Sequence, residues 1–99
     1  MTAASVHAPI GDLTIPAAQA QRELLLAALA EDGPELLLDL SQIESCDSAG
    51  VQLLVATRRS ALAAGRSMRI VDTSATVREA LKTYALDRLL LGPAEGTAS

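Results

Sequence analysis

The chain has 99 residues, 49% hydrophobic and 20% charged, a composition typical of a single globular domain rather than a disordered segment. Its formal net charge of −4 disfavours sequence-independent binding to nucleic acid or to an anionic membrane surface, because both are negatively charged. Tyr84 is the single aromatic residue and Cys46 the single cysteine, so the core is aliphatic and an intramolecular disulfide is excluded.

The single cysteine fits a reducing cytoplasm, and we expect the protein to be soluble. The N-terminus has no basic segment followed by a long apolar run, so a secretory signal is not expected. The longest Leu/Ala-rich segment, residues 24–30, is far shorter than the roughly 20 residues that span a bilayer. We expect residues 1–91 to form one domain and residues 92–99, which lack apolar periodicity, to be a frayed tail.

Two short strands are predicted at the start of the chain. Apolar residues alternate with others over residues 5–10, and Pro9 restricts this strand to the edge of a sheet. Residues 11–12 are a turn signal, and residues 13–15 form a second short apolar run. The pair is predicted to form a β-hairpin.

A helix and then a central strand are predicted next. Pro16 suits the first turn of a helix that runs to about Ala30. Helical spacing predicts its buried face from Ala20, Leu24, Ala27 and Ala28, with Leu25 and Leu29 beside them. Residues 36–40 form an apolar strand, and apolar residues on both of its faces indicate a sheet covered by helices on at least one side.

The second half of the chain alternates helix, strand and helix. A helix over residues 49–64 is predicted to bury Val51, Leu54, Val55 and Leu62, with Gly65 as its C-terminal cap. A strand follows at residues 68–71, and a third helix begins after residues 72–74, where Thr76 and Glu79 have capping-box spacing. A last short helix or turn is expected at residues 86–91. The alternation predicts an α/β layered fold.

The polar corner at residues 46–50 joins the central strand region to the second helix. Asp47 or Ser48 can cap this helix and leave a hydroxyl at its N-terminus. As an N-cap, Ser48 would contribute about 1 kcal/mol to the stability of this helix. Asp39 and Ser41 are predicted to shape a turn by local hydrogen bonds, and Cys46 to be a small apolar residue facing the core.

Catalysis is not expected. Ser48 would need a base, and the single histidine, His7, lies in the first predicted strand. The corner lacks the first glycine of a Gly-x-Ser-x-Gly nucleophile elbow, and the chain has neither a Walker-type phosphate loop nor a zinc-ligand cluster. We therefore expect no catalytic residue, no metal and no cofactor.

The corner and its flanks resemble the STAS domain, a family named for sulfate transporters and anti-sigma-factor antagonists. The resemblance rests on Asp39-Leu40-Ser41, followed by Asp47-Ser48-Ala49-Gly50 and an apolar helix, and continues through Gly65 and residues 68–71, 77–81 and 86–90. It covers most of the chain from about Gly11 onward. It implies a small mixed β-sheet with helices packed largely on one side.

This resemblance implies a function. In the anti-sigma antagonist branch, the serine directly after the corner aspartate is phosphorylated by a partner kinase, and this position maps onto Ser48. The implied partner is an anti-sigma factor or serine kinase of the histidine-kinase-like ATPase type. The family docks through the start and exposed side of the following helix, which here comprise Asp47, Ser48, Ala49, Gly50, Gln52, Arg58 and Arg59. Arg66 adds positive charge just after this helix.

An alternative follows from two departures from the antagonist pattern. Residues 11–15 look more like STAS proteins of chemotaxis operons or lipid-transport complexes, and Val51-Gln52 replaces the usual Leu-Gly after the corner. The alternative function is a non-enzymatic subunit of a lipid-transport ABC complex, docked on its ATPase, or of a chemosensory pathway. Ser48 would then contact the partner without being phosphorylated.

Overall fold

The computed structural model describes residues 6–31 and 33–91 and confirms the α/β class. Its elements in chain order are β1 (Val6–His7), β2 (Gly11–Leu13), the 3-10 turn η1 (Ile15–Ala17), α1 (Ala18–Leu29), β3 (Glu35–Leu40), β4 (Ile43–Cys46), α2 (Ser48–Ala63), β5 (Ser67–Thr73), α3 (Ala75–Thr83) and α4 (Asp87–Leu91). The tail predicted at residues 92–99 lies outside the described residues. The strand β4 was not predicted from the sequence.

The described strands form two small parallel sheets. One has the order β1-β3-β5 and the other pairs β2 with β4. The predicted hairpin is wrong, because Val6 pairs with Leu37 and Gly11 lies opposite Ile43. Two such short strands would be marginal as an isolated hairpin, and each gains a longer buried partner by pairing elsewhere. The described pairs are all parallel, where a mixed sheet was expected.

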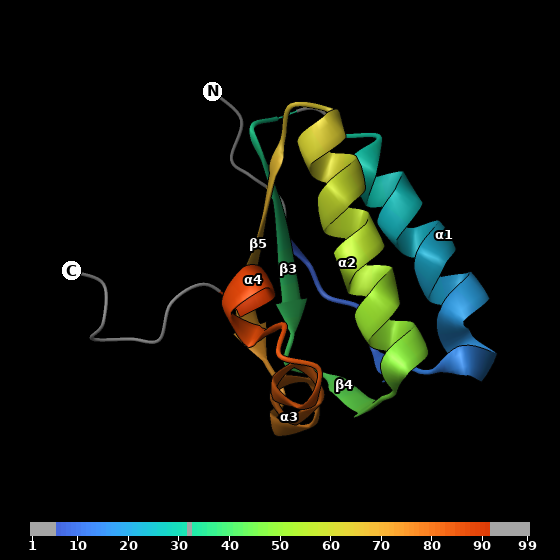
Figure 1. Ribbon diagram of the computed structural model, residues 1–99. Helices are drawn as coiled ribbons and strands as arrows, with labels where there is room; N and C mark the ends of the chain where they lie inside the picture. The colour runs from blue at the N-terminus through green and yellow to red at the C-terminus, as the bar shows by residue number, and fades with distance from the viewer. Residues whose placement is uncertain (1–5, 32, 92–99) are drawn as a thin grey trace.

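The main helices cover one face of the larger sheet, as expected. Figure 1 shows α1 and α2 side by side on this face, with α3 beyond the carboxyl end of β3 and α4 beside β5. Leu36, Leu38 and Leu40 of β3 are at most 1% exposed and point toward these helices. The alternate residues of β3 are only half-buried, so the opposite face of the sheet is more open.

The buried face of α1 differs from the prediction by about one residue. Gln21, Leu25 and Ala28 are buried, whereas Leu24 is 58% exposed. The Gln21 side-chain amide donates to the carbonyls of Ile10 and Asp12 at 3.3 and 3.1 Å. A pattern of apolar residues cannot locate this buried glutamine, whose hydrogen bonds hold the β2 segment against the helix.

The later helices show one confirmed cap and two corrections. Gly65 has φ +78°, as a C-terminal cap requires. The N-cap of α3 is Ser74, whose hydroxyl accepts from the Val77 N–H at 3.3 Å, so the predicted capping box at Thr76 is wrong. In α2, Ala61 is fully buried. Leu62, which was predicted to be buried, is 50% exposed.

Arg66 is a structural residue rather than part of the positive surface. It is 8% exposed. Its guanidinium donates to the carbonyls of Gly33, Ala28, Leu29 and Glu35 at 2.9, 3.1, 3.3 and 2.9 Å. These bonds satisfy carbonyls at the end of α1 and join this end to the start of β3.

Candidate functional site

The polar corner between β4 and α2 is organised by Asp47. Its backbone is extended, and α2 begins at the next residue. One carboxylate oxygen accepts from the N–H groups of Ala49 and Gly50 at 2.9 and 3.2 Å, and the other accepts from the Ile15 N–H at 3.1 Å. Asp47 therefore caps α2 and ties it to the segment after β2. This resolves the choice of cap in favour of Asp47.

Ser48 is the first residue of α2, and its side chain is exposed. Within the described residues its hydroxyl makes no hydrogen bond, because Asp47 already serves the first N–H groups of the helix. The interpretation of Ser48 as the N-cap is therefore wrong. The hydroxyl stands at the positive end of the helix dipole and is accessible to a partner.

Gly50, which was expected in the docking surface, has a packing role. It is buried, and a Cβ built on it would lie 2.6 Å from the Leu13 Cβ and 2.8 Å from the Leu13 carbonyl carbon. Only glycine lets the first turn of α2 approach β2 this closely. Ala49, also expected in the docking surface, is half-buried.

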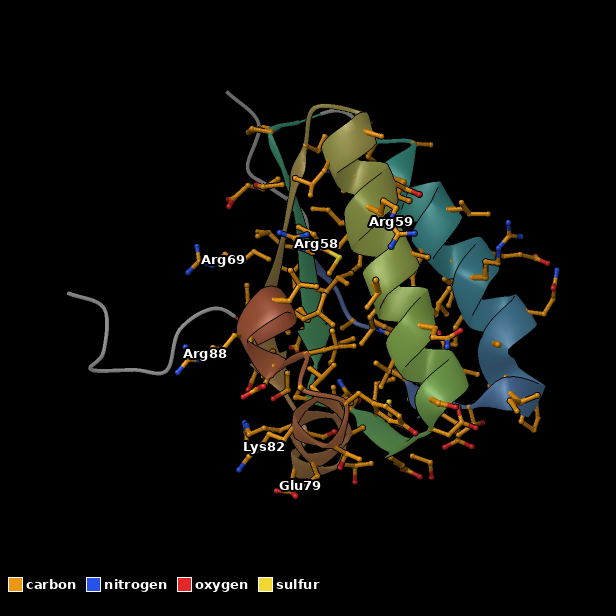
Figure 2. The ribbon with its side chains drawn as sticks, viewed as in Figure 1. Arg58, Arg59, Arg69, Glu79, Lys82 and Arg88 are labelled. Carbon is orange, nitrogen blue, oxygen red and sulfur yellow. The ribbon has the colours of Figure 1, made fainter. Side chains whose placement is uncertain are left out.

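The remaining expected docking residues divide between two sides of α2. At about 100° per residue, Ser48, Gln52 and Arg59 fall within an arc of about 40°. Gln52 and Arg59 are exposed, and we call these three residues the Ser48 face. Arg58 lies about 80° from Ser48 in the other direction, toward β5, and Figure 2 shows Arg58 and Arg59 diverging from the helix. Arg58 is thus not part of the Ser48 face.

Asp39, Ser41 and Cys46 have the local roles that were predicted for them. The Asp39 carboxylate accepts from the Ser41 N–H at 2.9 Å, and the Ser41 side chain and amide lower the pKa of Asp39. Cys46 packs half-buried against the core, and its thiol lies 3.8 Å from the Asp47 carbonyl oxygen, to which it donates. Burial, and then the Asp47 charge, raise the pKa of Cys46, so its thiolate is disfavoured.

His7 is engaged away from the corner. Its Nε2 lies 3.3 Å from a carboxylate oxygen of Glu31, which follows α1. The structure thus places the histidine beside Glu31 rather than beside Ser48. Among the described residues there is no group of three or more His, Cys, Asp or Glu side chains placed to hold a metal ion.

Sequence reasoning missed the second contact of Asp47. The bond to the Ile15 N–H joins residues that are 32 positions apart, and no local spacing signals it.

In the described part of the chain, none of the helices combines the length and apolar character needed to cross a membrane.

Comparisons with known proteins agree with this geometry. The family model described as "Mlab, STAS domain" matches residues 10–92. The crystal structure of an anti-sigma factor antagonist from Mycobacterium paratuberculosis is similar, with a TM-score of 0.76 and 27% sequence identity over 93% of this chain and 79% of that chain. A search of curated proteins gave no match.

Proposed function

Because this chain belongs to the STAS domain family, we propose that it is a cytoplasmic regulatory interaction module that works as anti-sigma-factor antagonists do. It binds an anti-sigma factor or serine kinase of the histidine-kinase-like ATPase type, and phosphorylation of Ser48 switches this binding. One observation carries the proposal: Asp47 caps α2, which leaves the Ser48 hydroxyl exposed and without a structural partner among the described residues.

The position of Ser48 suits a switch that leaves the fold intact. A phosphate adds between one and two negative charges and several strong acceptors. The N-terminus of α2 tolerates this charge because the helix dipole favours anions there. The neighbouring Asp47 carboxylate repels it, so the phosphate is directed outward, toward the partner. A surface that was polar and neutral at Ser48 then repels an acidic or apolar partner surface.

In the phosphoryl transfer, the catalytic groups belong to the partner kinase. The Ser48 oxygen attacks the γ-phosphorus of ATP bound to the kinase, the bond to the β-phosphate oxygen breaks, and ADP leaves. The kinase supplies the magnesium ion, and it also supplies the base that takes the serine proton. This chain contributes the nucleophile, held at a helix start, and the Ser48 face with the exposed Leu62 as its docking surface.

An affinity pull-down from the native host tests the proposal. Wild-type protein is compared with Ser48→Asp and with Ser60→Asp, which adds the same charge at an exposed position of α2 outside the Ser48 face. We expect wild type and Ser60→Asp to retain a kinase-like ATPase and Ser48→Asp to lose it. Mass spectrometry of recovered wild type should place one phosphate on Ser48. Full retention of the ATPase by Ser48→Asp would refute the switch.

The second candidate function is the non-enzymatic subunit of a lipid-transport ABC complex or a chemosensory pathway. It is favoured by the resemblance of residues 11–15 to STAS proteins of those systems. In the same pull-down it predicts a transporter ATPase or chemosensory protein, recovered with unmodified Ser48. The exposed hydroxyl would then be a direct contact.

A further inference from the structure

The strand β5 forms an edge of the larger sheet. The order β1-β3-β5 leaves one side of β5 without a neighbouring strand, and its seven residues make it the longest strand described. Outside the pairing with β3, residues 68–71 form no backbone hydrogen bond within the described chain. An edge strand of this kind presents N–H and C=O groups that can pair with another extended segment.

A hollow of about 440 Å³ lies along this edge. It is lined by residues 68–71 of β5, residues 89–91 of α4 and Arg58 of α2. Its charged lining residues are Arg58 and Arg69, and no acidic side chain is among them. The hollow thus combines an open strand edge, the apolar side chains of α4 and two positive charges.

The arginines around the hollow lack acidic partners among the described residues. In the described part of the chain the single salt bridge joins His7 to Glu31, and neither residue lines the hollow. Figure 2 shows Arg69 and Arg88 pointing to the same side of the molecule, away from α1, with Arg58 reaching across from α2. In a chain of net charge −4, this local excess of unpaired arginines is complementary to an acidic ligand.

We propose that the outer edge of β5 binds an extended acidic segment of a protein partner. The segment pairs with β5 as an added strand. Its carboxylates on the two faces of the extended sheet contact Arg58, which comes from α2 on the helix-covered face, and Arg69, which pairs with Leu37 and lies on the opposite face. Arginine suits this role because its guanidinium pairs with a carboxylate through two hydrogen bonds. Main-chain pairing provides affinity and the arginines provide selectivity for acidic side chains.

Two other occupants fit this edge less well. A second copy of this chain, paired β5 to β5 across a two-fold axis, would bring Arg58, Arg69 and Asp72 of each copy to one seam, which leaves a net positive charge there. A small anion would meet the arginines but leave the strand edge unpaired.

This surface is separate from the Ser48 face. Arg58 follows Ser48 by ten residues, which is about 15 Å along α2, and points toward β5 rather than along the Ser48 face. Both surfaces can be occupied in one complex. The proposal therefore does not depend on the phosphorylation of Ser48 and fails or succeeds independently of it.

A peptide titration followed by NMR tests the proposal on the full chain. The probe is a blocked seven-residue peptide, Glu-Glu-Val-Val-Glu-Glu-Val, which places glutamates on both faces of an added strand. Its control replaces each valine with proline, which keeps the charge but removes N–H groups needed for strand pairing. We expect the amide signals of β5 and α4 to shift with the first peptide only. The double variant Arg58→Gln/Arg69→Gln should weaken binding by roughly tenfold.

Matched controls separate the outcomes. The double variant Arg22→Gln/Lys82→Gln removes the same charge from exposed positions of α1 and α3 and should bind like wild type. Thermal melts establish that each variant is folded. Equal binding of the proline peptide, no shift at millimolar peptide, or a response of the same amides to inorganic phosphate alone would overturn the proposal. Concentration-dependent shifts of β5 without peptide would assign the edge to self-association and would also overturn it.

Discussion

Replacement of Gly50 by alanine tests the close contact between α2 and β2. The added Cβ would lie 2.6 Å from the Leu13 Cβ and 2.8 Å from the Leu13 carbonyl carbon, well inside normal contact distance. Because the nearest atoms belong to or adjoin the backbone, no side-chain rotation relieves the overlap, and the first turn of α2 must move. Overpacking of this kind costs about 3 kcal/mol, while alanine regains about 1 kcal/mol of helix propensity.

The expected net loss for Gly50→Ala is therefore about 2 kcal/mol in the free energy of unfolding, or a fall of about 10 °C in Tm. Urea unfolding followed by circular dichroism measures the first quantity, and a thermal melt measures the second. Ser48→Ala, two residues earlier and exposed, serves as the control and should change stability little. Unchanged or increased stability of Gly50→Ala would refute the packing argument and with it the geometry that presents Ser48.

Three further changes probe the cap, the buried arginine and the thiol. Asp47→Ala should lower the free energy of unfolding by about 2 kcal/mol, since it loses the cap and the bond to the Ile15 N–H; urea unfolding that matches wild type would contradict this role. Arg66→Met should cost about 3 kcal/mol in the same assay, because buried carbonyls lose their donors, and Arg66→Lys should recover only part of it; equal stability of all three proteins would contradict the assignment. The pKa of Cys46 is raised by burial and by the Asp47 charge, so iodoacetamide should alkylate folded protein at pH 8 more slowly than urea-unfolded protein. Because the pKa of Cys46 is higher in the folded than in the unfolded protein, the free energy of unfolding falls as the pH rises toward the folded-state pKa. Cys46→Ser should lose this fall in stability at alkaline pH.

The amino-acid sequence by itself determined the order of most elements and the place of the polar corner. Apolar periodicity and turn residues act over a few neighbours, which is why the central strand, α2, α4 and the Gly65 cap were predicted close to their observed positions. The signal for the corner also lies in neighbouring residues, because an aspartate and a serine at a strand-to-helix junction suffice to predict a capped helix start. The sequence also carried the family resemblance that the comparisons support.

Only the tertiary structure decided which residues these elements bury and which strands pair. The parallel pairing of Val6 with Leu37, and the burial of Gln21 and Arg66, depend on backbone groups far away in the chain. A polar side chain is buried where distant backbone carbonyls need a hydrogen-bond donor. The pattern of hydrophobic residues along the sequence does not predict where such carbonyls lie. Arg58 and Arg59 differ for the same reason. Both lie in the same turn of α2, and it is the position of β5 beside α2 that places Arg58, but not Arg59, at the hollow along the strand edge.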